Sequence, residues 1–159
     1  MKIALASDTH GHFEALAAEL LQEKVDRVLF AGDHLRDAWS LARQLHLSID
    51  AVPGNCDLGY AQAPGELLLS IWNRRILLTH GHRYRVKNNL HALFYRGQEL
   101  RADAVVFGHT HQVCCEAVND LWLLNPGSAS VWYKNQQATY ILLHIDEQNF
   151  RPEVRYFQG

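Results

Sequence analysis

Short apolar runs alternate with amphipathic stretches through the first third of the chain. Three mainly apolar runs, at residues 3–6, 28–30 and 49–52, have the length expected of buried strands. Between them, apolar residues recur at helical spacing over residues 13–21 and 35–45. Strands that alternate with helices in this way indicate βαβ units and a mostly parallel sheet.

The rest of the chain predicts more strands and one more helix. Residues 66–72 and 75–78, joined by a polar turn at residues 73–74, predict a hairpin, and residues 89–100 predict a helix. Further extended segments are expected at residues 104–107, 112–118, 121–124, 138–145 and 153–157, the last as an edge strand after Pro152. The predicted class is therefore α/β, with two sheets flanked by helices in a single domain over residues 1–159.

The amino-acid composition and charge exclude several classes of protein. Of the 159 residues, 48% are hydrophobic and 20% are charged, which excludes disorder and fibrous classes. The formal charge of −2 gives no general attraction to extended nucleic acid or to an anionic membrane. No segment has the ~20 consecutive apolar residues of a membrane helix. Three cysteines, two of them adjacent, are typical of reduced thiols, so we expect a cytoplasmic protein.

Residues able to bind a metal follow five of the predicted strands. These polar endings are Asp8-Thr9-His10, Gly32-Asp33, Gly54-Asn55-Cys56-Asp57, His80-Gly81-His82 and Gly108-His109-Thr110-His111. Each alone is typical of a turn or a helix cap. Together they are expected to meet at one sheet edge, because ligands of open α/β sheets bind outside the carboxyl ends of the strands. Carboxylate, imidazole and amide groups suit a borderline divalent ion better than calcium or a thiolate-bound zinc.

In this order, the five motifs resemble those of the calcineurin-like metallophosphoesterase superfamily, most closely its small YfcE-type phosphodiesterases. The resemblance covers residues 1–130 and includes a further family motif, Asn125-Pro126-Gly127-Ser128. Residues 131–159 carry no motif and are expected to supply closing strands. The resemblance implies a four-layer α/β/β/α sandwich, which agrees with the strand and helix pattern.

The resemblance also implies a ligand set for two divalent metal ions. One ion would be held by Asp8, His10, Asp33 and His111. The other would be held by Asp33, Asn55, His80 and His109. Asp33 would bridge the ions, and His80 is preferred to His82 because the first histidine of its motif matches the ligand. Mn²⁺ is the preferred ion, with Ni²⁺, Co²⁺, Zn²⁺ and Fe²⁺ as alternatives.

The implied activity is hydrolysis of a phosphoester, such as a small phosphodiester or a nucleotide. Two ions about 4 Å apart lower the pKa of a bridging water, and the resulting metal-bound hydroxide attacks phosphorus in line. Asp33, Asn55 and His80 are the expected catalytic residues, since they hold the ions and Asn55 can also hydrogen-bond a substrate oxygen.

Cys56 departs from the larger relatives, which carry histidine at this position near the leaving group. A thiol is a weak hydrogen-bond donor, so poor leaving groups are expected to react slowly. His12 and His82 are substitutes for that histidine, or else ordinary surface residues. Arg83, in the basic stretch 83–87, belongs either to a solvated loop or to a rim that attracts phosphate. The candidate substrate-binding residues are Asn55, Cys56, His12 and Arg83.

Two other functions compete with the enzyme. Some proteins of this fold, such as the retromer subunit, act chiefly as protein-binding scaffolds, but here each ligand position carries a competent residue. A nuclease acting on long nucleic acid is disfavoured, because the sequence has no extended basic surface. Assembly as a homo-oligomer is left open by the sequence.

Overall fold

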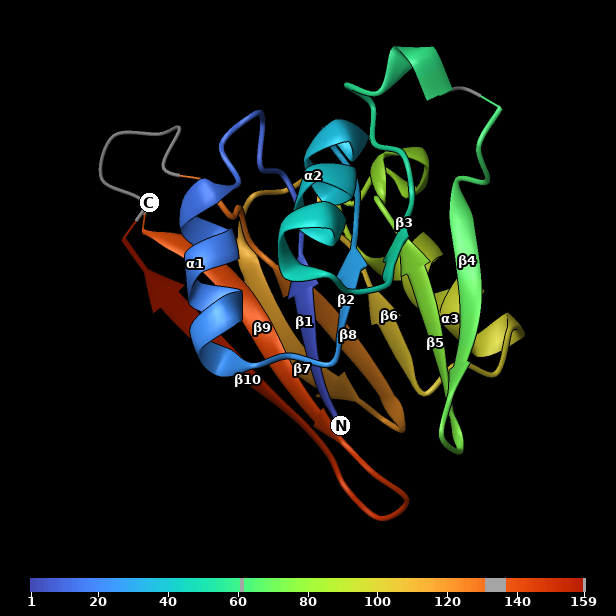
Figure 1. Ribbon diagram of the computed structural model, residues 1–159. Helices are drawn as coiled ribbons and strands as arrows, with labels where there is room; N and C mark the ends of the chain where they lie inside the picture. The colour runs from blue at the N-terminus through green and yellow to red at the C-terminus, as the bar shows by residue number, and fades with distance from the viewer. Residues whose placement is uncertain (61, 131–136, 159) are drawn as a thin grey trace.

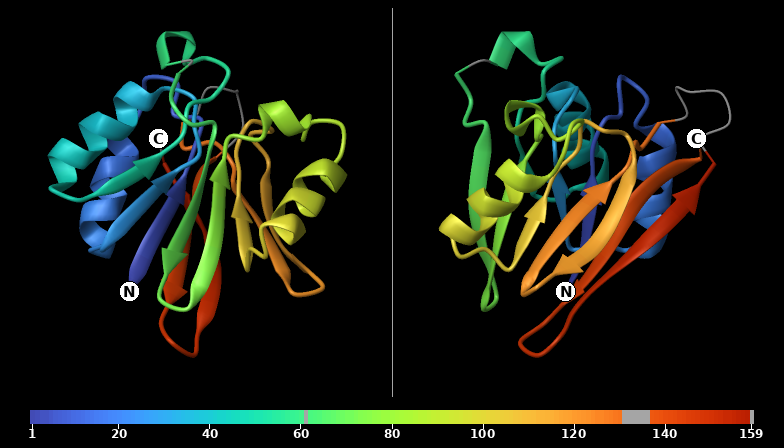
Figure 2. Two further views of the ribbon diagram at one scale, coloured as in Figure 1. Left: turned by 90° about the vertical axis from the view of Figure 1, so that its right-hand side faces the viewer. Right: turned by 180° about the vertical axis from the view of Figure 1, so that it is seen from behind.

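Two sheets packed face to face form the centre of the protein, and helices cover both outer faces (Figures 1 and 2). The structure is a computed structural model that describes residues 1–60, 62–130 and 137–158. The prediction of an α/β/β/α sandwich is confirmed by this arrangement. Among the helices of the described residues, none has the length and apolar character needed to cross a membrane.

The first sheet is built from both ends of the chain, in the order β10-β9-β1-β2-β3. Its strands are β1 (Lys2–Ala6), β2 (Arg27–Phe30), β3 (Ile49–Ala51), β9 (Ala138–Ile145) and β10 (Phe150–Phe157). β1, β2 and β3 run parallel, whereas β9 and β10 pair antiparallel. The helices α1 (Glu14–Glu23) and α2 (Leu35–Leu45) connect the parallel strands, as the βαβ pattern predicts.

The second sheet has the order β4-β5-β6-β8-β7. Its strands are β4 (Glu66–Ile71), β5 (Arg74–Thr79), β6 (Ala104–Val106), β7 (Val113–Val118) and β8 (Leu121–Pro126). The helix α3 (His91–Glu99) covers its outer face, and two short 3₁₀ helices, η1 (Leu58–Tyr60) and η2 (His82–Tyr84), lie in loops. The expectation of a mostly parallel sheet was wrong, because both sheets are mixed: β9 runs antiparallel to its neighbours β1 and β10 in the first sheet, and the edge strands β4 and β7 are antiparallel in the second.

Three apolar layers hold the four structural layers together. Leu16 and Leu41 of the helices α1 and α2 pack with Phe30 on the outer face of the first sheet. The layer between the sheets includes Leu29 from the first sheet and Ile76, Val106 and Leu124 from the second. The layer under α3 includes Leu77, Leu93, Val105 and Phe107. Because β1, β2, β5 and β6 are covered on both faces, they carry the continuous apolar runs seen in the sequence.

Two of the differences from the predicted boundaries have a clear structural cause. The β4–β5 turn lies at Trp72 and Asn73, one residue earlier than expected, because Ile71 pairs with Arg74 and Trp72 adopts a left-handed φ of 54°. The last strand begins before Pro152 and includes it. An edge strand tolerates proline because one row of its backbone N–H groups needs no partner strand.

We expect Leu29→Ala to lower the free energy of unfolding by about 2–5 kcal/mol, because it opens a cavity between the sheets. Leu29 is fully buried there. Leu21→Ala, on the exposed side of α1, should change this free energy by less than about 0.5 kcal/mol. Urea denaturation of both variants measures the difference, and equal effects would contradict the assignment of the layer between the sheets.

Candidate metal centre

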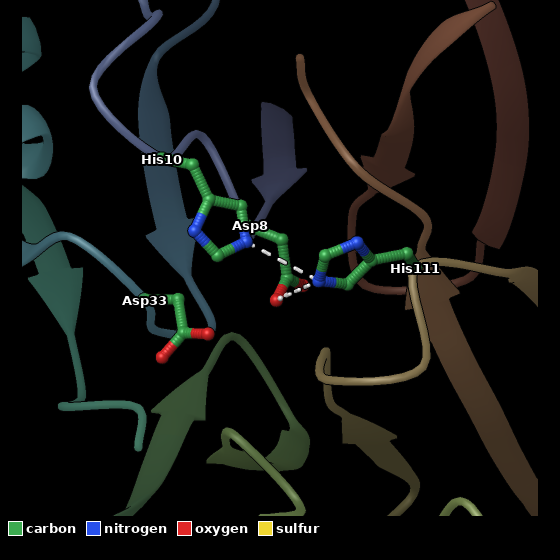
Figure 3. A group of neighbouring side chains, drawn as sticks. All are labelled: Asp8, His10, Asp33 and His111. Atoms are coloured by element: carbon green, nitrogen blue, oxygen red, sulfur yellow. Dashed lines mark hydrogen bonds and ion pairs between the residues drawn. The ribbon is translucent and has the colours of Figure 1, made fainter. Parts of the chain in front are cut away.

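Four side chains from three loops meet at the upper end of the sandwich in Figure 1. They are Asp8, His10, Asp33 and His111, and one ligand atom from each lies within 4.8 Å of the others. Figure 3 shows their carboxylate and imidazole groups converging from different parts of the chain. The loop after β1 carries two of them, the end of β2 leads to Asp33, and the end of β6 leads to His111. The structure thus brings together the four ligands predicted for the first ion.

Asp8 is the most deeply buried member of this cluster, with no exposed surface. The Nε2 atom of His111 lies 3.1 Å from its Oδ1, and the backbone N–H of His109 donates to its Oδ2 at 3.1 Å. Burial alone would raise the pKa of Asp8, but hydrogen bonds from His111 and His80 outweigh it and hold the pKa below its usual range. The carboxylate is therefore ionised at neutral pH.

His80 and Asp33 extend the cluster toward the residues predicted for the second ion. The Nε2 atom of the fully buried His80 lies 3.5 Å from Asp33 Oδ2 and 3.4 Å from Asp8 Oδ1. The ring of His109 lies 5.0 Å from the ring of His80. Asp33 thus belongs to the group predicted for the first ion and also lies close to His80, a predicted ligand of the second.

Asn55 joins the group at its exposed border. Its Nδ2 lies 3.5 Å from Cys56 Sγ, and the backbone N–H of Cys56 donates to Asp33 Oδ1 at 2.9 Å. The exposed amide of Asn55 therefore stands beside the predicted bridging carboxylate. This position suits a residue that contacts both an ion and a substrate oxygen.

Five of the seven predicted ligands have a left-handed backbone. The φ angles are 55° for Asp8, 49° for His10, 58° for Asp33, 69° for His109 and 57° for His111. Non-glycine residues adopt this region rarely, and each such residue costs on the order of 1–3 kcal/mol. The surrounding contacts hold these residues in strained conformations, which is typical of functional sites.

Close packing around Asp33 explains two of the motif glycines. A Cβ atom at Gly54 would stand 2.0 Å from Asp33 Oδ1. A Cβ atom at Gly32 would stand 2.8 Å from His80 Cδ2, and Gly32 also has a φ of +94°. Glycine therefore allows the carboxylate, the imidazole and the third loop to approach one another.

Two buried aspartates that the sequence analysis left without a role hold the first three loops in place. Asp37 accepts hydrogen bonds from Thr9 Oγ1 at 2.6 Å and from the backbone N–H of Gly11 at 2.8 Å. Asp57 accepts backbone N–H bonds from Leu35 at 2.8 Å and from Gly54 at 2.9 Å. Asp57 was part of the motif considered, whereas Asp37 was found only from its contacts.

The hydrogen bonds of Asn125 give the motif Asn125-Pro126-Gly127-Ser128 a structural role. Its Nδ2 donates to the Gly108 carbonyl at 2.9 Å and to Thr110 Oγ1 at 3.0 Å, while its Oδ1 accepts the Gly127 N–H at 2.9 Å. The side chain is fully buried. It therefore fixes the loop that presents His109 and His111.

The chemistry of these donors fits a divalent cation. Burial lowers the pKa of His109 to about 4 and also lowers the pKa of His10, so both imidazoles are neutral at pH 7 and keep a lone pair. Together with the ionised Asp8, they form the mixed nitrogen and oxygen donor set that borderline divalent ions bind. The residues present thus fit a metal site.

His82 contacts the predicted ligand His80 through a ring nitrogen. The two Nδ1 atoms lie 2.9 Å apart, so one of them carries the shared proton. With a cation bound and His80 Nδ1 as the donor to His82, Nε2 would give up its hydrogen bond to Asp8 and offer its lone pair to the ion. Partners of this kind fix the tautomer of metal-binding histidines.

The three remaining candidates for substrate binding lie at different distances from the cluster. Cys56 is exposed beside Asp33, and burial together with the Asp33 charge raises the pKa of its thiol to about 11. His12 is exposed on the loop after β1, where its backbone N–H donates to the Thr9 carbonyl. Arg83 is exposed on η2, and its guanidinium packs against Gly65 before β4. The protonated thiol makes Cys56 a poor nucleophile.

Comparison with known proteins agrees with the fold and the motifs. Residues 1–148 match the model of the calcineurin-like phosphoesterase superfamily domain. The probable metallophosphoesterase YsnB of Bacillus subtilis is 32% identical over 99% of this chain and 90% of its own length. Phosphodiesterase YfcE of Escherichia coli is 29% identical over 92% of this chain and 89% of its own length.

A solved structure shares the fold. The crystal structure of wild-type Vps29 from Entamoeba histolytica, complexed with Zn²⁺, matches with a TM-score of 0.79 and 22% identity, covering 98% of this chain and 99% of that one. The family model and the YsnB relative together span nearly the whole chain. This chain therefore belongs to the calcineurin-like phosphoesterase superfamily.

Proposed function

We propose that this protein is a phosphodiesterase that hydrolyses small phosphodiesters with two divalent metal ions. The coarser class, a phosphoric ester hydrolase, follows from its family and from relatives named metallophosphoesterase and phosphodiesterase. The dinuclear centre, the choice of a diester and the preference for Mn²⁺ are the proposed part.

The observation that carries the proposal is the position of Asp33. Its carboxylate lies in the cluster with Asp8, His10 and His111, and its Oδ2 also lies 3.5 Å from Nε2 of His80. A carboxylate has two oxygens and a full negative charge, so it can serve two cations at once. His80, His109 and Asn55 offer further donors beyond the four of this cluster, which supports a second ion.

When bound, two such ions lower the pKa of a shared water and neutralise charge on the phosphoryl oxygens. The chain's own residues set the geometry for this step. His80 is fully buried and fixed by His82, so it holds its place without rearrangement. Asn55 is exposed and polar, which suits it to orient a phosphate oxygen at the open border of the site.

A protein-binding scaffold is the second candidate function, because scaffolds such as the retromer subunit share this fold. The complete set of competent donors supports the enzyme instead. A folded protein that binds metal but cleaves no phosphoester with manganese, nickel, cobalt or zinc would favour the scaffold.

We expect metal-stripped protein to hydrolyse bis-p-nitrophenyl phosphate only after Mn²⁺ is added. Asp33→Ala should lower this rate by more than about a hundredfold, because loss of the bridging ligand removes several kcal/mol of transition-state stabilisation. Release of p-nitrophenolate measures the rate, and calorimetric titration with Mn²⁺ should find two ions per chain in the unchanged protein.

Glu147→Ala is the matched control, since it removes an exposed carboxylate from the loop between β9 and β10. Circular dichroism shows whether each variant is folded. Substantial Mn²⁺-dependent activity in folded Asp33→Ala protein, or a single bound ion in the unchanged protein, would contradict the dinuclear centre.

His82→Ala should weaken Mn²⁺ binding about tenfold or more, because loss of an outer hydrogen-bond partner typically lowers metal affinity by about 10–100-fold. His91→Ala removes an exposed histidine from the start of α3 and serves as the control. Calorimetric titration of both variants measures the affinity. Equal affinity in the His82 variant and in the unchanged protein would show that His82 does not position His80.

A further inference from the structure

The loop between β3 and β4 forms a cavity at the border of the metal centre. The cavity has a volume of about 470 Å³, within the range of small-molecule sites. It is lined by His34, Arg36, Cys56, Asp57, Leu58, Gly59 and Tyr60. In Figure 1 this loop rises above the sheets at the same end of the molecule as the metal centre.

Two lining residues connect the cavity directly to Asp33. His34 follows Asp33 in the chain, and its ring centre lies 5.4 Å from that of His10. Cys56 donates its backbone N–H to Asp33 Oδ1 at 2.9 Å. A phosphate held beside Asp33 would therefore have one of its ester groups within reach of the cavity.

Apolar and aromatic groups form one wall of the cavity. Tyr60 is held by Trp39 of α2, with the ring centres 5.0 Å apart and the planes at 86°. Leu58, two residues earlier, is 85% exposed. The edge-to-face contact fixes the Tyr60 ring, so a flat ligand can stack on it without ordering a free side chain.

The cavity lining also carries a positive charge. Arg36 is exposed in the first turn of α2 and lines the same space as Tyr60. A guanidinium group can pair with phosphate and can also stack on an aromatic plane. The cavity thus combines a fixed ring, an exposed apolar side chain and a cation beside a phosphate-binding position.

We propose that this cavity binds an aromatic ring carried on the phosphoester, as the base of a nucleotide is. The inference rests on the proposed function, since it places the ring relative to a phosphate held at the metal centre. Tyr60 stacks on the ring, Leu58 covers its edge, and Arg36 attracts the charged ligand. These residues make nucleotides and aryl phosphodiesters better substrates than alkyl phosphodiesters of equal charge.

The test compares two ligands that share a sugar phosphate and differ in the base. Adenosine 5′-monophosphate and ribose 5-phosphate are titrated into the Mn²⁺-loaded protein by calorimetry. We expect the nucleotide to bind about tenfold more tightly, the effect of one base stacked on an aromatic side chain. Equal affinities in the unchanged protein would overturn the inference.

Variants at Tyr60 identify the surface that binds the ring. Tyr60→Ala should abolish the preference for the nucleotide, whereas Tyr60→Phe should keep it because the ring is retained. Tyr95→Ala, which removes an exposed tyrosine from α3, is the matched control and should also keep the preference. A preference that survives in folded Tyr60→Ala protein would overturn the assignment.

Arg36→Gln separates charge from stacking. It should weaken the binding of both ligands by the same factor, since both carry a phosphate. An unchanged affinity for both ligands would overturn the role of Arg36.

Parallel assays distinguish this inference from the proposed function. Mn²⁺-dependent cleavage of bis-p-nitrophenyl phosphate with equal affinity for the two ligands would overturn the ring site alone. If the protein neither binds the two ligands nor cleaves the diester, the proposed function is overturned, and the ring site with it.

Discussion

The burial of Asp8 and Asp33 at the end of the sandwich is the constraint on which the rest of the site depends. Both carboxylates are almost inaccessible to water, and a buried charge is stable only when it is paired and hydrogen-bonded. His80 and His111 supply such partners, with His80 contacting both carboxylates. The same arrangement of negative oxygens and imidazole nitrogens is what a divalent cation binds. The structure thus concentrates negative charge where the proposed chemistry requires cations.

Holding these groups together strains the backbone, and buried polar side chains offset the strain. Left-handed residues recur along the loops after β1, β2 and β6. Asp37, Asp57 and Asn125 bind the N–H and carbonyl groups that such tight turns leave without a regular partner. None of the three is a predicted ligand, yet each fixes a loop that carries ligands. The precision of the site therefore depends on residues that have no chemical role in the reaction.

The proposed chemistry and the proposed specificity come from different parts of the fold. The ligands are placed by strand ends and short loops that are packed against both sheets. The cavity lies at the border of the site, between the first turn of α2, which carries Arg36, and the longer connection between β3 and β4, which carries Tyr60. Changes in that connection can alter which ester group is accepted without moving Asp33 or His80. This separation is common where a rigid scaffold positions reactive groups and loops select the ligand.

The sequence alone indicated the α/β class and the five polar strand endings, because continuous apolar runs and the polar groups that follow them are local features, and the resemblance of these motifs to the superfamily implied the ligand set. It placed Asp8, Asp33 and His111 at strand ends, and it preferred His80 to His82. Only the tertiary structure decided which strands pair in each sheet and that both sheets are mixed, since local patterns do not specify pairing partners across 100 residues or more, such as Leu5 with Ile141. The contacts of Asp37, Asn125 and Tyr60 were likewise visible only in the tertiary structure, because a hydrogen bond or a ring contact depends on positions that only the folded chain brings together.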